Sequence, residues 1–363
     1  MGRLPPRAHL SAVVGEAVGF VVPDLGRPSG GTAYDEAVVR AWPAHLPVPV
    51  VHRVPVNDTA AGELAEAPAA QRVCIVDGLL GSEHPDLLAA ARSRGHRVVL
   101  LVHLPRPADG HPDEEAGRLA ALEAQAIAEA AATVVPSRWA AQDLAARYGR
   151  TAVVAVPGTD PAPVADTHDP PVVVQLGAIG PLKNQLLLAH AALACRGLRF
   201  RLRFVGPVVD PAYAAELTSA LAPLGDTASV EGALTGQARD ELLAAADLVV
   251  SVAHRETYGM TVTEGLARGI PAVVGRGTGA EEALTAGGTA PGRAVATDGP
   301  AELSAALRGV LTDPVLRAQW RTSALHARDR LPGWEETARA IARVCASVQD
   351  ELGAEVGAQG EPA

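Results

Sequence analysis

Residues 248–274 read LVVSVAHRETYGMTVTEGLARGIPAVV. Two short apolar runs, at 248–252 and 271–274, flank a stretch of helical character at 261–268. Continuous apolar runs of this length are typical of strands buried on both faces of a parallel sheet, and helices connect such strands. The segment therefore predicts a strand–helix–strand unit of an α/β protein.

The same alternation extends in both directions along the chain. Segment 157–171 contains five prolines and no periodicity, which predicts a linker. We therefore expect an α/β fold with two Rossmann-like domains, each a doubly wound parallel sheet, facing a cleft where a ligand would bind. The predicted parts are an N-terminal domain (1–157), a C-terminal domain (158–335) and a C-terminal helix, near 334–348, with a flexible tail (336–363 in all).

Composition and charge exclude several classes of protein. The chain has 363 residues, and 31 basic against 41 acidic side chains give a net charge of −10, which argues against nucleic-acid binding. Cys74, Cys195 and Cys345 fit neither a metal spacing nor a disulfide framework, so we expect a reducing, cytoplasmic compartment. No run of 18 apolar residues occurs, and the first 15 residues are interpreted as a loose leader rather than a signal peptide.

Lys183 is the one lysine among the 31 basic residues, and Asn184 beside it is one of two asparagines. A GC-rich genome would replace Lys by Arg wherever chemistry permits. The surviving lysine therefore indicates a place that needs a compact ammonium rather than a guanidinium fork, and the alternative is chance retention.

Glu256 and Glu264 lie on either side of a predicted helix start near Gly259. A helix N-terminus attracts phosphate, and a glycine lets an anion approach the backbone. Carboxylates nearby can accept hydrogen bonds from hydroxyls, so the pair suits a nucleotide sugar, which carries a diphosphate between two polyols. We expect Glu264 in the first turn of the helix. The alternative is that Glu264 only complements the helix dipole and Glu256 is solvated.

The segment ETYGMTVTEGLARGIPAVV resembles the E-x7-E segment of retaining glycosyltransferases of the GT-B type, family four. The resemblance covers residues 172–284 well and the N-terminal half more loosely, through SGGTAYDEAV and LLVHLP. It implies that the C-terminal domain binds the nucleotide sugar and the N-terminal domain the acceptor. It also implies that Glu256 contacts the transferred sugar and Glu264 the ribose, with the backbone of Tyr258, Gly259 and Met260 at the diphosphate.

The resemblance also gives Lys183 a role. The family's loop usually reads G-R-x4-K, with Arg and Lys both on the diphosphate, but Ala178 stands here in place of the Arg. Arg255 either compensates for that loss or is an ordinary surface arginine. We include Arg255, Thr257 and Asn184 among the expected donor-binding residues.

In the N-terminal half, Gly30 and Gly31 are expected in the first strand-to-helix turn, where the backbone could approach the diphosphate or the acceptor. His103 follows an apolar strand. In the family a histidine here hydrogen-bonds the donor sugar, although a lone histidine at a strand end can also be structural.

The expected function is transfer of a sugar from a UDP- or GDP-linked donor to a small soluble acceptor, with retention and with Glu256, Lys183 and His103 as catalytic residues. We expect no cofactor and no metal site, since no D-x-D occurs in a plausible loop. The acidic predicted helix at 113–132 argues against strong membrane association. A nucleotide-sugar epimerase of the same fold and a non-catalytic nucleotide-sugar-binding protein are the alternatives, and the oligomeric state is left open.

Overall fold

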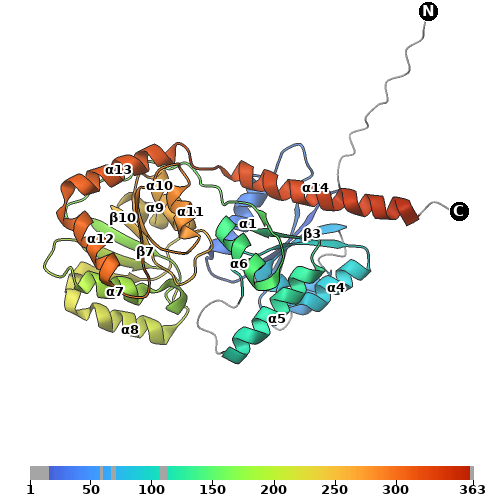
Figure 1. The fold of residues 1–363 in the computed structure, drawn as a ribbon, viewed down its shortest axis with the longest axis horizontal. Helices are drawn as coiled ribbons and strands as arrows, with labels where there is room; N and C mark the ends of the chain where they lie inside the picture. The colour runs from blue at the N-terminus through green and yellow to red at the C-terminus, as the bar shows by residue number, and fades with distance from the viewer. Residues whose placement is uncertain (1–15, 58–59, 67–70, 107–112, 360–363) are drawn as a thin grey trace, which may run out of the picture.

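The computed structural model describes residues 16–57, 60–66, 71–106 and 113–359. The predicted leader at 1–15 and the last four residues lie outside this range. Two six-stranded sheets, all parallel, lie side by side with helices around each, so the predicted fold of two Rossmann-like domains is confirmed (Figure 1). Among the described residues, no helix is both long and apolar enough to cross a membrane.

The N-terminal sheet has the strand order β2-β1-β3-β4-β5-β6. Its four inner strands are almost wholly buried, as the apolar runs predicted. The strands are β1 (Gly19–Asp24), β2 (Val50–Pro55), β3 (Val73–Asp77), β4 (Arg97–Leu101), β5 (Ala132–Val135) and β6 (Val153–Val154). The helices are α1 (Gly30–Arg40), α2 (Ala60–Glu66), α3 (Gly78–Gly81), α4 (Pro85–Ser93), α5 (Asp113–Glu129) and α6 (Arg138–Tyr148).

The C-terminal sheet has the order β12-β11-β10-β7-β8-β9. Its strands are β7 (Val172–Leu176), β8 (Arg201–Val205), β9 (Ala228–Glu231), β10 (Leu248–Ser251), β11 (Ala272–Gly275) and β12 (Gly292–Val295). Its helices are η2 (Pro181–Lys183), α7 (Gln185–Leu193), α8 (Pro211–Leu221), η3 (Ala222–Thr227), α9 (Gly236–Ala244), α10 (Met260–Ala267), α11 (Ala280–Thr285), α12 (Ala301–Thr312) and α13 (Pro314–Arg328).

The predicted linker is packed rather than loose. Ala165 N–H donates to Arg268 O at 2.9 Å, and Asp166 N–H donates to Ala244 O at 3.1 Å, so this part of the segment is fixed to the C-terminal domain. The chain passes between the domains twice, at Gly158 and again just before Trp334. These two segments are in backbone contact, so a Cβ at Gly158 would overlap the backbone of Trp334. Proline rigidity and these hydrogen bonds explain how an aperiodic segment keeps one conformation.

The last helix, α14 (Trp334–Gln359), returns to the N-terminal domain and lies along it (Figure 1). Its apolar side, including Trp334, Ile341 and Cys345, joins the core formed by β1, β3 and α1. The helix continues well beyond residue 348, so the prediction of a flexible tail from there was wrong for residues 349–359. Alanine and glutamate favour helix, and packing of Val348 and Leu352 extends it.

Candidate active site

Glu256 lies on the loop between β10 and α10, at the carboxyl edge of the C-terminal sheet. The connection between β11 and α11 supports this loop, because Gly279 N–H donates to Glu256 O at 2.7 Å. Gly259 has φ 89°, a left-handed conformation that glycine adopts at little cost, and the chain then enters α10 at Met260. The backbone N–H groups of the first turn of α10 therefore begin immediately beyond the Glu256 loop.

Lys183 and Glu256 meet directly, since Lys183 Nζ lies 2.6 Å from Glu256 Oε2. Lys183 ends η2 in the loop after β7, and its aliphatic chain rests against Gly177. Gln175 Nε2 donates to Lys183 O at 2.7 Å, which fixes the backbone at this point. The sequence placed these two side chains in separate loops, and the adjacency of β7 and β10 in the sheet brings them together.

Glu264 lies in the second turn of α10, so the prediction that it falls in the first turn was wrong. The helix begins at Met260, close to the predicted start, and Glu264 is its fifth residue, one position past the first turn. In this position Glu264 forms an ion pair with Arg239 of α9. Both line a cavity of about 640 Å³ that extends from α9 and α10 to α1, and Met260 borders it as well.

Arg255 is neither an open surface arginine nor a second cation at the Lys183 loop. Arg255 Nη2 donates to Asp143 Oδ2 on α6 at 2.7 Å, and its guanidinium lies 5.4 Å from the centre of the Trp139 ring. Arg255 therefore links the Glu256 loop to the N-terminal domain. At the position of the family's arginine, Ala178 O accepts a hydrogen bond from Gln185 Nε2 at 2.8 Å.

The other predicted donor-binding residues of the C-terminal domain have mixed surroundings. Thr257 and Tyr258 are buried, and the Tyr258 hydroxyl has no hydrogen-bond partner within the described ranges. Burial raises the pKa of Tyr258 above its usual range, so this hydroxyl stays protonated. Asn184 takes the left-handed conformation at φ 52° where η2 leads into α7, which explains an asparagine at that position.

His103 follows β4 and is the centre of a buried polar cluster in the N-terminal domain. His103 Nε2 lies 2.8 Å from Asp35 Oδ1 and 3.4 Å from Asp77 Oδ2. Gly31 belongs to the same arrangement, because a Cβ there would lie 3.0 Å from the imidazole ring. Gly30 has open space around it, and both glycines open α1 rather than lying in the preceding turn, because Ser29 caps the helix.

Asp35 and Asp77 were not predicted from the sequence. Asp77 is the last residue of β3, where a polar side chain ending an apolar run is a usable signal. Asp35 lies on the buried side of α1 beside Tyr34 and Val38, and a carboxylate on an apolar helix face is the signal there. Arg239 and Asp143 were also missed, because each becomes relevant only through a partner from another part of the chain.

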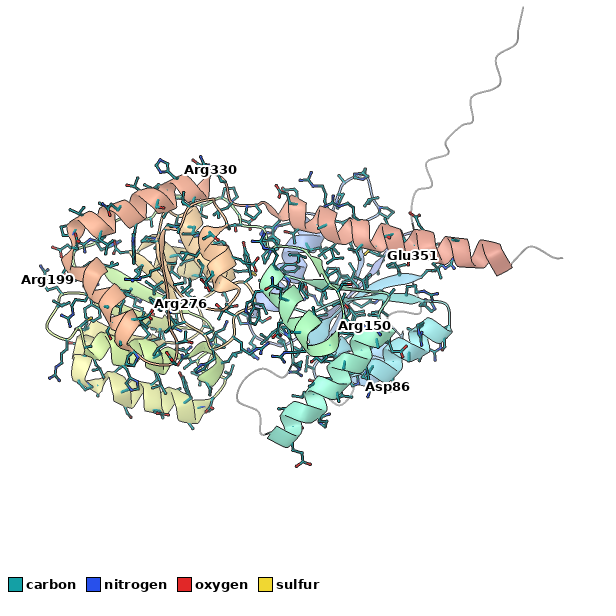
Figure 2. The ribbon with its side chains drawn as sticks, in the orientation of Figure 1. Asp86, Arg150, Arg199, Arg276, Arg330 and Glu351 are labelled. Carbon is teal, nitrogen blue, oxygen red and sulfur yellow. The ribbon has the colours of Figure 1, made fainter. Side chains whose placement is uncertain are left out.

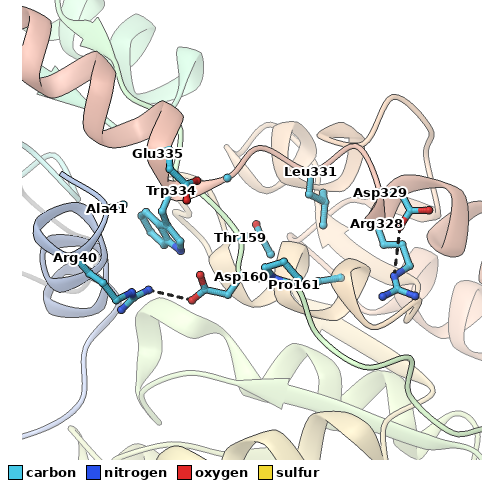
Figure 3. Close-up of a pocket in the computed structure, with 12 residues that line it drawn as sticks. Arg40, Ala41, Thr159, Asp160, Pro161, Arg328, Asp329, Leu331, Trp334 and Glu335 are labelled. Atoms are coloured by element: carbon cyan, nitrogen blue, oxygen red, sulfur yellow. Dashed lines mark hydrogen bonds and ion pairs between the residues drawn. The ribbon is translucent and has the colours of Figure 1, made fainter. Parts of the chain in front are cut away.

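A second cavity, of about 420 Å³, lies where the linker passes the start of α14 (Figure 3). Arg40 of α1 and Asp160 of the linker are joined across it at 3.0 Å, and Trp334 forms part of its wall. Arg40, Asp160 and Trp334 line the first cavity too, so the two spaces are neighbours between α1 and the linker.

The comparisons with known proteins agree with this architecture. The family model "Glycosyl transferases group 1" matches residues 159–326. D-inositol 3-phosphate glycosyltransferase from a Nocardioides species is 31% identical over 188 residues, which are 47% of this chain and 40% of that protein. The chain thus matches less than half of the length of this curated relative.

Solved structures show the same fold over nearly the whole chain. HepE of Anabaena, in complex with UDP and glucose, has a TM-score of 0.73 at 17% identity and covers 91% of this chain and 99% of its own. Sucrose-phosphate synthase from Thermosynechococcus elongatus has a TM-score of 0.74 at 17% identity, covering 93% and 100%. We conclude that the chain has the two-domain GT-B fold and that its C-terminal half is similar to group 1 glycosyl transferases.

Proposed function

We propose that the protein transfers a sugar from a UDP- or GDP-linked donor to a hydroxyl of a small soluble acceptor, with retention of the anomeric configuration. The observation that carries the proposal is the 2.6 Å contact between Lys183 Nζ and Glu256 Oε2, four residues before the start of α10. A cation for the diphosphate, a carboxylate for sugar hydroxyls and a helix N-terminus then occupy one place.

The comparisons support a nucleotide sugar as the donor. HepE was crystallised with UDP and glucose and with UDP-glucose, and the Nocardioides relative is named as a glycosyltransferase. In our proposal Lys183 and the backbone of Tyr258, Gly259 and Met260, where the loop enters α10, hold the diphosphate. Glu264 accepts from the ribose after releasing Arg239, inside the 640 Å³ cavity. That volume lies in the range of small-molecule sites.

The proposed reaction breaks the bond between the sugar C1 and the β-phosphate oxygen and forms a bond from C1 to the acceptor oxygen. The departing phosphate takes the acceptor proton, so no separate general base is required. Glu256 and His103 hold the sugar while this happens. Because Ala178 replaces the family's arginine, Lys183 and the helix N-terminus supply the positive charge at the leaving group.

A thermal-shift panel of uridine, guanosine and adenosine diphosphates and their hexose conjugates tests the proposal. A ligand at one hundred times its dissociation constant stabilises the fold by about 2.7 kcal/mol. We expect one base to give a clear shift, and Lys183→Met to abolish it. Lack of a shift with every nucleotide would contradict the proposal.

Proton NMR of the reaction identifies the chemistry. The stabilising donor is incubated alone and then with a set of small polyol acceptors. We expect slow hydrolysis alone and, with an acceptor, a product whose anomeric coupling matches that of the donor. A changed sugar still attached to nucleotide would indicate an epimerase, and an inverted product would remove the claim of retention.

A further inference from the structure

The cluster around His103 contains more charge than a sugar-binding histidine alone requires. Asp35 is fully buried, Asp77 is almost fully buried, and both approach the same ring nitrogen, Nε2. The side chain of His103 is 17% exposed, and among the described residues its other nitrogen, Nδ1, has no hydrogen-bond partner. The ring is therefore held from one edge only.

Each carboxylate is fixed by its own surroundings. Asp77 caps α3 and accepts from Leu79 N–H at 2.6 Å, which leaves its second oxygen for the imidazole. Asp35 lies on the buried side of α1, which fixes its position. Its second oxygen, Oδ2, is buried and has no hydrogen-bond partner in the described part of the chain. The Tyr34 ring meets the imidazole edge-on at a centroid distance of 4.9 Å. The ring thus has little freedom to rotate.

We propose that Asp35 and Asp77 are positioning residues for the transfer, which keep His103 as an imidazolium with Nε2–H directed at the two carboxylates and Nδ1–H left for a ligand. The inference rests on the proposed function for the identity of that ligand, a sugar hydroxyl or another neutral oxygen acceptor. An imidazolium only donates, whereas a neutral ring held at Nε2–H would only accept at Nδ1. The two carboxylates therefore decide whether His103 donates to the oxygen of a ligand hydroxyl or accepts its proton.

The balance of charge supports this assignment. Burial by itself lowers the pKa of His103, yet Asp35 and Asp77 together raise it to about 10. Burial raises the pKa of Asp35, His103 lowers it and Asp77 raises it, with a net value of about 7. Within the described ranges, the other titratable side chain packed against the ring is the Tyr34 phenol, whose pKa burial raises well above its usual value, so it stays neutral. One imidazolium among two buried carboxylates lowers the cost of burying them.

Imidazole nitrogen NMR of the full chain tests the protonation state without any substrate. The His103 signals are assigned by their loss in His103→Gln. We expect imidazolium shifts at pH 8 in the wild type and a neutral ring at pH 8 in Asp35→Asn, with Asp77→Asn as an independent second variant. Asp86→Asn is the control, because Asp86 is an exposed carboxylate on α4, away from the boundary between the domains (Figure 2).

A neutral ring in the wild type at pH 8, or an unchanged ring in both variants, would overturn the proposal. The cluster also has the donors of a metal site, so the chelator-treated protein is titrated with Zn²⁺. Stoichiometric displacement of the His103 signals by Zn²⁺ would likewise overturn it. None of these outcomes depends on whether the protein transfers sugars.

The pH profile of turnover then tests the link to catalysis. We expect Asp35→Asn to lower kcat by about 100-fold, the scale of a misplaced catalytic group, with a smaller change in the donor KM. The remaining activity of Asp35→Asn should fall as pH rises above 7, because His103 loses its proton there. In the wild type His103 stays protonated over this range, so its titration should not change the activity. A pH profile identical to the wild type would reduce Asp35 to a structural residue. Absence of turnover in the wild type with every donor would contradict the proposed function and leave the NMR result standing.

Discussion

Glu256 is held at two points that belong to different segments. Its carboxylate contacts Lys183 and its backbone carbonyl accepts from Gly279 N–H. The side chains of Lys183 and Glu256 are 30% and 14% exposed, so the cost of desolvating both charges offsets much of their attraction and the ion pair contributes little net stability. The same contact fixes the direction of a carboxylate that would otherwise sample several rotamers, which is the property a sugar-binding group needs.

Glu256→Gln should therefore separate activity from folding. We expect kcat to fall about 100-fold or more, as for loss of one charged contact to a transition state, while the melting temperature changes little. Glu302→Gln is the control, because Glu302 also forms an ion pair in the same domain, with Arg276, but is more exposed. Near-normal turnover in Glu256→Gln would remove its assigned role.

The Asp35 and His103 pair gives stability a pH dependence of definite sign. His103 has a folded pKa raised from 6.5 to about 10, so its contribution is fully present below pH 6.5 and is lost as pH rises through about 10. Asp35 has a folded pKa raised from 3.8 to about 7, so its ionisation costs stability as pH rises through that window. Both effects act in the same direction.

The melting temperature of the wild type should consequently fall between pH 6.5 and pH 10. In Asp35→Asn the fall should be smaller, because the variant loses the carboxylate that holds the imidazolium. Differential scanning calorimetry at matched ionic strength measures both curves, with Asp86→Asn as the control. Parallel curves of melting temperature against pH for the wild type and Asp35→Asn would show that Asp35 does not help to keep His103 protonated.

At the scale of elements, the N-terminal end of α10 depends on the connection between β11 and α11. A Cβ at Gly279 would overlap the carbonyl of Thr257, so the two loops touch through their backbones. Gly279 has φ −61°, an ordinary helical value that any residue can adopt. Glycine is needed there because there is no space for a side chain. The Glu256 loop is therefore shaped by a segment more than twenty residues further along the chain.

Gly279→Ala should displace the Glu256 loop. We expect a loss of about 1–3 kcal/mol in the free energy of unfolding, typical of an added methyl group without space, together with weaker nucleotide binding. Gly299→Ala is the comparison, since a Cβ at Gly299 meets nothing within 4 Å. Urea unfolding and the thermal shift with the preferred nucleotide provide the two measurements, and equal behaviour of the two variants would contradict the argument.

At the scale of the whole molecule, the domains are joined across the cleft as well as through the linker. Glu282 of α11 accepts from Trp139 N–H at 2.6 Å and from Arg138 N–H at 3.2 Å, at the N-terminus of α6. Trp139 Nε1 also donates to Gly277 O at 2.7 Å, and Arg255 pairs with Asp143 nearby. A carboxylate at a helix N-terminus is a favourable and salt-sensitive contact. These contacts hold the two domains in the observed arrangement.

Glu282→Gln should shift the domains toward a more open arrangement. We expect a larger radius of gyration by small-angle scattering and a lower donor affinity, with the nucleotide partly restoring the compact form. Glu281→Gln is a closely matched control, because Glu281 is on the same helix but accepts from Gly277 within its own domain. A scattering curve unchanged by Glu282→Gln would show that other contacts hold the domains together.

The strands could be predicted from the sequence because burial on both faces requires continuous apolar runs, as in β3 and β10. Lys183 and Glu256 could be proposed as site residues because the rarity of lysine and a nearby helix start mark them locally, and the structure brings their side chains into contact. Asp35 and Asp143 could not, since their significance comes from partners 68 and 112 residues away. Gly30 and Gly31 were expected in a turn but begin α1, because the Ser29 cap decides where that helix starts.

The last helix has a consequence for how the protein is made. Trp334, Ile341 and Cys345 of α14 complete the core of the N-terminal domain, whose strands are all synthesised before this helix. During translation that domain must wait, with an apolar flank uncovered, until the entire second domain has left the ribosome. The N-terminal half expressed by itself should consequently aggregate or recruit chaperones. Supplying α14 through a short artificial connection after β6 should rescue it as an independent unit.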